Sequence, residues 1–112
     1  MFRTSDFINE GKFMFTFNDF NRVDTTRFNI LEKSSYALAI QSKQTGNCWY
    51  ILDRCYKNIN SLSVFKSLVY GSENHHYCNS GSVPQALDVI KKAERLEINE
   101  RERKRRMREL AV

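Results

Sequence analysis

The chain of 112 residues carries a net charge of +5 and 41% hydrophobic residues, which fits one small globular domain. No apolar run approaches the roughly 18 residues of a membrane-spanning helix, and polar residues interrupt any secretory leader near the N-terminus. We therefore expect a cytoplasmic protein that does not bind membranes. We expect one domain over residues 1–112, with a mostly β body and short helices over 1–82 and a long charged helix over 83–112.

The N-terminal segments predict a short helical turn and then a strand. Residues 4–10 begin with side chains that cap helices, and Gly11 ends this turn. Residues 12–18 place three phenylalanines at alternate positions, which is typical of a strand with one buried face. The polar residues 19–26 are interpreted as a loop.

The middle of the chain predicts an antiparallel sheet. Apolar and polar residues alternate, or apolar residues dominate, in three segments that we predict to be strands: residues 27–33, 36–42 and 48–53. Residues 44–47 contain Gly46 and form a hairpin signal. Residues 48–53 are apolar on both faces, which indicates the centre of the sheet. Because Ala37 and Ala39 are small, we expect a helix to approach their face closely.

The second half of the chain predicts two helices. Apolar residues recur at steps of three and four over residues 60–70, which indicates a short helix, and residues 71–82 are interpreted as a linker. Ser82 is a good helix cap and Pro84 is tolerated in a first turn, and no helix breaker follows. The predicted fold is α+β: a small antiparallel sheet of about four strands in meander order, packed with a short helix and a long C-terminal helix.

Positive charge gathers at the end of the chain. The last 22 residues hold nine Lys/Arg, five Asp/Glu and no Gly, Pro or aromatic residue. Guanidinium groups on one side of a helix can contact the phosphates of a nucleic acid. Helical spacing places Arg101, Lys104, Arg105 and Arg108 on one side as a basic stripe. The predicted nucleic-acid-binding residues are Arg101, Arg103, Lys104, Arg105, Arg106 and Arg108.

Acidic residues interleave this basic run, so other uses of the helix stay open. The helix can simply be solvated, or it can face an acidic protein surface. Three pairs of opposite charge four residues apart are predicted to support it locally: Glu97–Arg101, Glu100–Lys104 and Glu102–Arg106.

A second side of the helix carries a heptad seam. Seven residues follow alternating steps of four and three: Val89, Ala93, Leu96, Glu100, Arg103, Met107 and Leu110. The predicted interface with a protein partner or a second copy comprises Leu96, Glu100, Arg103, Met107 and Leu110. In an antiparallel pair, Glu100 of each copy would face Arg103 of the other. Alternatively, the helix packs on its own sheet through Leu87, Ile90, Ala93 and Leu96 and then frays.

Three cysteines without the spacing of a disulfide framework indicate a reducing compartment. Cys78 follows His75 and His76, and thiolate and imidazole are good zinc ligands. Six residues separate Cys48 from Cys55, however, whereas zinc knuckles place about two to four residues between cysteines. The pattern favours buried thiols and a polar surface loop, so we expect no metal and no other cofactor.

The sequence also contains candidates for catalysis and for base stacking. His76 and Cys78 have the chemistry of a base and a nucleophile, but nothing in their spacing enforces a catalytic geometry, so we predict that the protein is not an enzyme. The phenylalanine stripe is typical of a core. This leaves Trp49 and Tyr56 as candidates for stacking on bases.

The sequence therefore predicts a non-enzymatic binding protein that docks on a nucleic acid or nucleoprotein complex through its basic C-terminal helix, as a regulator or inhibitor. Small size, a charged helix and no catalytic motif are typical of accessory proteins of phages and mobile elements. Two alternatives stay open. One is a protein–protein interaction module or homodimer that uses the seam. The other is a small hydrolase or nuclease that uses His75 and His76.

Overall fold

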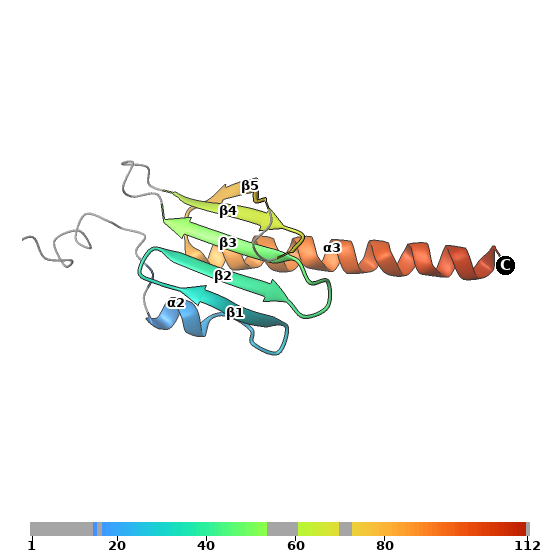
Figure 1. Ribbon diagram of the computed structural model, residues 1–112, viewed down its shortest axis with the longest axis horizontal. Helices are drawn as coiled ribbons and strands as arrows, with labels where there is room; N and C mark the ends of the chain where they lie inside the picture. Colours follow the sequence, from blue (N-terminus) through green and yellow to red (C-terminus); the bar gives the residue numbers. More distant parts are fainter. Residues whose placement is uncertain (1–14, 16, 54–60, 70–72, 112) are drawn as a thin grey trace, which may run out of the picture.

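The computed structural model describes residues 15, 17–53, 61–69 and 73–111, which form one antiparallel sheet, a short helix and a long helix (Figure 1). The strands are β1 (Phe28–Lys33), β2 (Ala37–Ser42), β3 (Cys48–Asp53), β4 (Leu62–Ser67) and β5 (His75–Ser80). The helices are α2 (Phe17–Asn21) and α3 (Val83–Leu110). The sheet order is β1-β2-β3-β4-β5, so each strand pairs with its neighbour along the chain. The predicted α+β meander is confirmed, with three of the predicted strands present and two further strands, β4 and β5, that were not predicted.

The first three strands lie where the alternation of residues predicted them. β3 is the middle strand of the five, as its apolar residues on both faces indicated. The hairpin between β2 and β3 turns at Gly46, whose φ of 79° is a backbone conformation that a residue without Cβ adopts freely. Two hydrogen bonds close the turn, from the Gly46 N–H to the Ser42 carbonyl (3.0 Å) and from the Ser42 N–H to the Asn47 carbonyl (2.9 Å).

The predicted helix over residues 60–70 is wrong, because residues 62–67 form β4. Leu62 and Val64 alternate with serine and are fully buried, so the twofold period of a strand describes them better than helical steps. Each residue of β4 pairs with one of β3. The predicted linker holds β5, an edge strand that the apolar pattern missed because its first three residues are exposed.

The predicted strand over residues 12–18 is also wrong at its end, because α2 begins at Phe17 and continues into the predicted loop. Phe20 of this helix packs on the buried ring of Phe15, with 6.1 Å between ring centroids, and Val23 joins the same core. The turn at the end of α2, in which the Val23 N–H donates to the Phe20 carbonyl (3.2 Å), brings Phe20 and Val23 to one side, which an extended strand does not. Residues 4–10, 12–14 and 16 lie outside the described residues, with the predictions made for them.

The core lies between α3 and the sheet. It combines Leu38, Ile40 and Trp49 of the sheet with Ala86 and Ile90 of the helix, all almost fully buried. We expected a helix on the alanine face of β2, and α3 does not cover that face. The helix covers the opposite face, where the larger side chains remove more apolar area from water.

The start of α3 follows the capping prediction. The Ser82 hydroxyl accepts a hydrogen bond from the Gln85 N–H (3.3 Å), and Pro84 lies in the first turn. With 28 residues, α3 is about 42 Å long at 1.5 Å per residue. This exceeds the length of the strands, and Figure 1 shows the C-terminal part of α3 extending beyond the sheet. We call residues 99–110 the overhang.

Candidate nucleic-acid interface

A buried carboxylate joins α3 to the sheet near the point where the helix leaves it. Glu94 is 5% exposed and accepts hydrogen bonds from three side chains of the β2–β3 region. The donors are the Thr45 hydroxyl (2.8 Å), the Asn47 amide (3.0 Å) and the Trp49 indole N–H (3.1 Å). The Asn47 amide also donates to Glu97, at 3.0 Å, and so bridges two acids one turn apart. Helix position and hairpin position are thereby fixed relative to each other.

Glu97 continues the same network toward β4. It accepts a hydrogen bond from the Lys66 ammonium (3.0 Å) and one from the Arg101 guanidinium (2.6 Å). Burial by itself would raise the pKa of Glu97, but the hydrogen bonds from Lys66 and Asn47 and the charges of Lys66 and Arg101 lower it below its ordinary value of 4.5. We call these six residues the polar clamp: Thr45, Asn47, Trp49, Lys66, Glu94 and Glu97.

The position of Trp49 in the polar clamp corrects its prediction as a base-stacking residue. The polar clamp also contains residues that the sequence pattern did not single out. Trp49, a candidate for base stacking, is fully buried, with Lys66 over its ring at 5.4 Å and Tyr77 against its edge at 5.1 Å between centroids. Its partner Glu94 follows Ile90 by four residues on the buried side of the helix. In the sequence, only a charged residue on the apolar side of the predicted helix could have indicated this buried network. Tyr56 lies outside the described residues.

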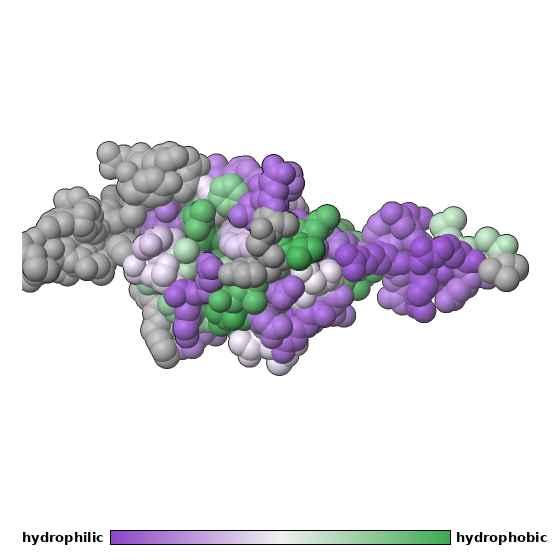
Figure 2. Space-filling view, viewed as in Figure 1, coloured by the Kyte–Doolittle hydropathy of each residue, from purple (hydrophilic) through white to green (hydrophobic). Residues whose placement is uncertain are grey.

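The buried side of α3 becomes basic beyond the sheet. Alternating steps of three and four residues connect one line along the helix: Leu87, Ile90, Glu94, Glu97, Arg101, Lys104 and Arg108. The line is apolar over the sheet, acidic at the polar clamp and basic in the overhang. The basic stripe, Arg101, Lys104, Arg105 and Arg108, is exposed. Figure 2 shows the overhang as almost entirely hydrophilic.

Most of these cations form ion pairs with acidic residues of the same helix. The three predicted pairs are confirmed, with distances of 2.6 Å for Glu97–Arg101, 4.0 Å for Glu100–Lys104 and 3.5 Å for Glu102–Arg106. Arg108 forms no ion pair with another described residue. The overhang holds six basic and three acidic residues, so a net charge of +3 remains.

The remaining predicted residues lie on other sides of the helix. Arg103 and Arg106 do not belong to the line that continues the buried side. Arg103 instead pairs with Glu100 at 2.6 Å, within its own chain, and its guanidinium lies 3.3 Å from the Met107 sulfur.

The apolar side chains of the seam are exposed to solvent from Leu96 to Leu110. Leu96, Met107 and Leu110 are 69%, 58% and 84% exposed. Leu96 therefore does not pack on the sheet, contrary to the alternative in which it joins Leu87 and Ile90 there. Glu94 and Glu97 make the contact at this level of the helix instead.

The described histidines and cysteines do not form a cluster. His75 and His76 are exposed on β5, and the His76 Nε2 lies 2.9 Å from the Asn79 Oδ1. Burial raises the pKa of the Cys78 thiol. Within the described part of the chain, no three His, Cys, Asp or Glu side chains form a cluster that could hold a metal ion. Cys55 lies outside that part.

The protein is thus an α+β meander whose C-terminal helix leaves the sheet as a charged rod. Comparison of the chain with family models, curated proteins and solved structures finds no match. Across the described residues, no helix has both the length and the apolar composition needed to cross a membrane.

Proposed function

We propose that the protein binds the phosphate backbone of a nucleic acid through the basic stripe of its overhang. The observation that carries this proposal is the change along one side of α3, from buried apolar residues to exposed cations, at the edge of the sheet. The polar clamp fixes the helix on the sheet, so the cations extend from a defined position. Because the cations are already positioned, less conformational entropy is lost on binding.

The composition of α3 favours duplex over single-stranded nucleic acid. Proteins that bind single strands usually stack bases on aromatic side chains, and α3 contains none. Contacts of arginine and lysine with phosphates carry no sequence information, so the proposed binding depends on charge rather than on sequence. A protein that covers a duplex in this way can act as a regulator or inhibitor of a nucleoprotein complex.

Binding to a short fluorescent DNA duplex, followed by anisotropy at low salt, tests this function. We expect Lys104→Gln/Arg108→Gln to bind about tenfold more weakly than the wild type. These two residues suit the test because Arg108 has no ion pair among the described residues and Lys104 has only a long one. The matched control is Arg22→Gln/Lys92→Gln, which removes the same charge from two exposed residues outside the overhang.

We expect the control to bind like the wild type, and the single strand to bind more weakly than the duplex. Equal losses in the two variants would mean that only net charge matters. No binding by the wild type would overturn the proposal.

A second candidate function, self-association through the seam, rests on the exposure of Leu96, Met107 and Leu110. In an antiparallel pair of helices, Glu100 and Arg103 would exchange their present partners for those of the second copy. The seam and the basic stripe lie on different sides of α3, so one use does not exclude the other.

Sedimentation equilibrium tests the seam. We expect the mass of the wild type to rise toward two chains with concentration, and that of Leu96→Asp/Met107→Asp to stay at one. The control Leu68→Asp/Val69→Asp changes two exposed apolar residues next to β4 and should behave like the wild type. A wild-type mass of one chain at high concentration would exclude this use.

A further inference from the structure

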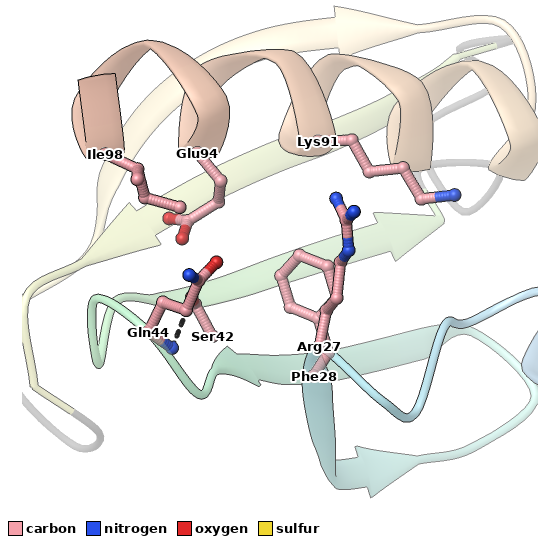
Figure 3. A pocket seen from close by; sticks show the side chains of 7 residues that line it. All are labelled: Arg27, Phe28, Ser42, Gln44, Lys91, Glu94 and Ile98. Carbon is pink, nitrogen blue, oxygen red and sulfur yellow. Dashed lines mark hydrogen bonds between the residues drawn. The ribbon is translucent and has the colours of Figure 1, made fainter.

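A groove of about 520 Å³ lies at the base of the overhang, between α3 and the turns that flank β1 and β2. Its lining residues come from three separate segments: Thr26, Arg27, Lys43, Gln44, Arg95 and Ile98. A cavity of about 20 Å³, which is room for a single water molecule, adjoins it and shares Arg27, Gln44 and Ile98. Figure 3 shows Arg27 reaching from the sheet toward α3, with Lys91 and Glu94 on either side.

Three cationic side chains line the groove, and none forms an ion pair shorter than 3.7 Å with another described residue. The Arg27 guanidinium lies 3.7 Å from the Asp24 carboxylate and its side chain is 64% exposed. The Lys43 ammonium donates to the Thr25 carbonyl oxygen at 2.8 Å, which leaves its charge uncompensated. Arg95 is exposed and forms no ion pair with the other described residues. An anion that enters the groove therefore meets a surplus of positive charge.

Two carboxylates lie near the groove, and both accept hydrogen bonds. Hydrogen bonds from Thr26 lower the pKa of Asp24, and the charges of Arg27 and Lys91 lower it further. Glu94 is buried and accepts the donors of the polar clamp. Hydrogen bonds do not remove the charge of a carboxylate, so Asp24 and Glu94 offset two of the three groove cations, and a surplus of one positive charge remains.

The groove leads directly into the basic stripe. Ile98 is the last groove residue on α3, and Arg101 and Arg105 follow it three and seven positions later on the same side of the helix. From Ile98 to Arg108 the helix advances about 15 Å at 1.5 Å per residue. A duplex carries one phosphate per 3.4 Å on each strand, so this path faces about four phosphates of one strand.

We propose that this groove holds the sugar-phosphate backbone of the same duplex that the basic stripe contacts. This inference rests on the proposed function and extends it, because the binding site then runs from the body of the protein onto the overhang. Lys43 and Arg95 contact phosphates at the base, and the basic stripe contacts those farther along.

The test compares three variants of the full chain that each remove two positive charges: Lys43→Gln/Arg95→Gln in the groove, Lys104→Gln/Arg108→Gln in the basic stripe and Arg22→Gln/Lys92→Gln as control. Circular dichroism and thermal unfolding establish that each variant is folded. Anisotropy with the DNA duplex then gives affinity over a series of salt concentrations. We expect the groove variant to bind about tenfold more weakly than the control, and its plot of log K against log salt to be shallower by about two.

The outcomes separate this inference from the function on which it rests. If the groove variant binds like the control while the stripe variant is weakened, the duplex does not enter the groove and the function of the overhang stands. If the groove and stripe variants both match the control, the inference and the proposed function fail together.

Discussion

At the scale of single residues, the acidic side chains of α3 differ in how far they are buried. Glu94 is buried among donors, and Glu97 is partly buried between Lys66 and Arg101. Glu100, one turn farther along, lies in water and pairs with Arg103 of its own helix. Pairs exposed in this way contribute little to stability, because water and salt screen them. Glu94 and Glu97 therefore hold the helix on the sheet.

The lowered pKa of Glu97 makes part of the stability depend on pH. A carboxyl group whose pKa is lower in the folded state stabilises the fold above its unfolded value of 4.5, and this contribution is lost as pH falls through the folded value. We expect Glu97→Gln to lower the free energy of unfolding at neutral pH, and the difference from the wild type to shrink near pH 3.5 or so. Urea unfolding at both pH values measures it. A difference that does not change with pH would contradict this role, and Glu102→Gln in the overhang is the control.

At the scale of elements, α3 consists of two parts with different supports. Its first part packs Ala86, Leu87 and Ile90 on the sheet. Among the described residues, the overhang is supported by hydrogen bonds and ion pairs within α3, including the pair of Arg101 with Glu97, and the cations near its C-terminus also complement the negative end of the helix dipole. The polar clamp lies at the junction and sets where one part ends.

Removal of Glu94 tests the polar clamp. In Glu94→Ala, the indole N–H of Trp49 loses its acceptor and the amide of Asn47 loses one of its two, while both stay buried, so we expect a loss of about 3 kcal/mol in the free energy of unfolding. Glu109→Ala, which changes a 65% exposed acid, should cost less than about 0.5 kcal/mol. Chemical denaturation measures both. Equal costs would show that the buried hydrogen bonds do not support the junction.

The sequence predicted the features of α3 that depend on near neighbours. Ser82, Pro84 and the absence of later breakers marked the helix, and spacing along it predicted its ion pairs. The contacts of Glu94 with residues 45–49 could not be predicted, because they join segments more than 40 positions apart and depend on how the helix crosses the sheet.

The errors in the sheet also have physical causes. Leu62 and Val64 fit a period of two, but other apolar residues nearby fit steps of three and four, and only pairing with β3 decides for a strand. β5 carries almost no apolar signal, since its exposed first residues form the edge of the sheet. The small alanines of β2 led us to expect a helix on their face, but α3 packs on the opposite face, where larger side chains bury more apolar area.

At the scale of the whole molecule, the protein combines a small packed body with a charged rod that extends from it (Figure 1). The groove lies at their junction and the basic stripe beyond it, so both can face one long anion. The seam occupies another side of the rod. This arrangement accounts for the concentration of positive charge at the end of the chain, where burial no longer restricts it.

The salt dependence of duplex binding by the wild type and by Lys104→Gln/Arg108→Gln is the most direct test of the proposed binding site. Each phosphate contact that is lost should reduce the slope of log K against log salt by about 0.9, so we predict a slope shallower by about 1.8 in the variant. The control Arg22→Gln/Lys92→Gln should keep the slope of the wild type. Identical slopes in all three proteins would contradict phosphate contact by the basic stripe.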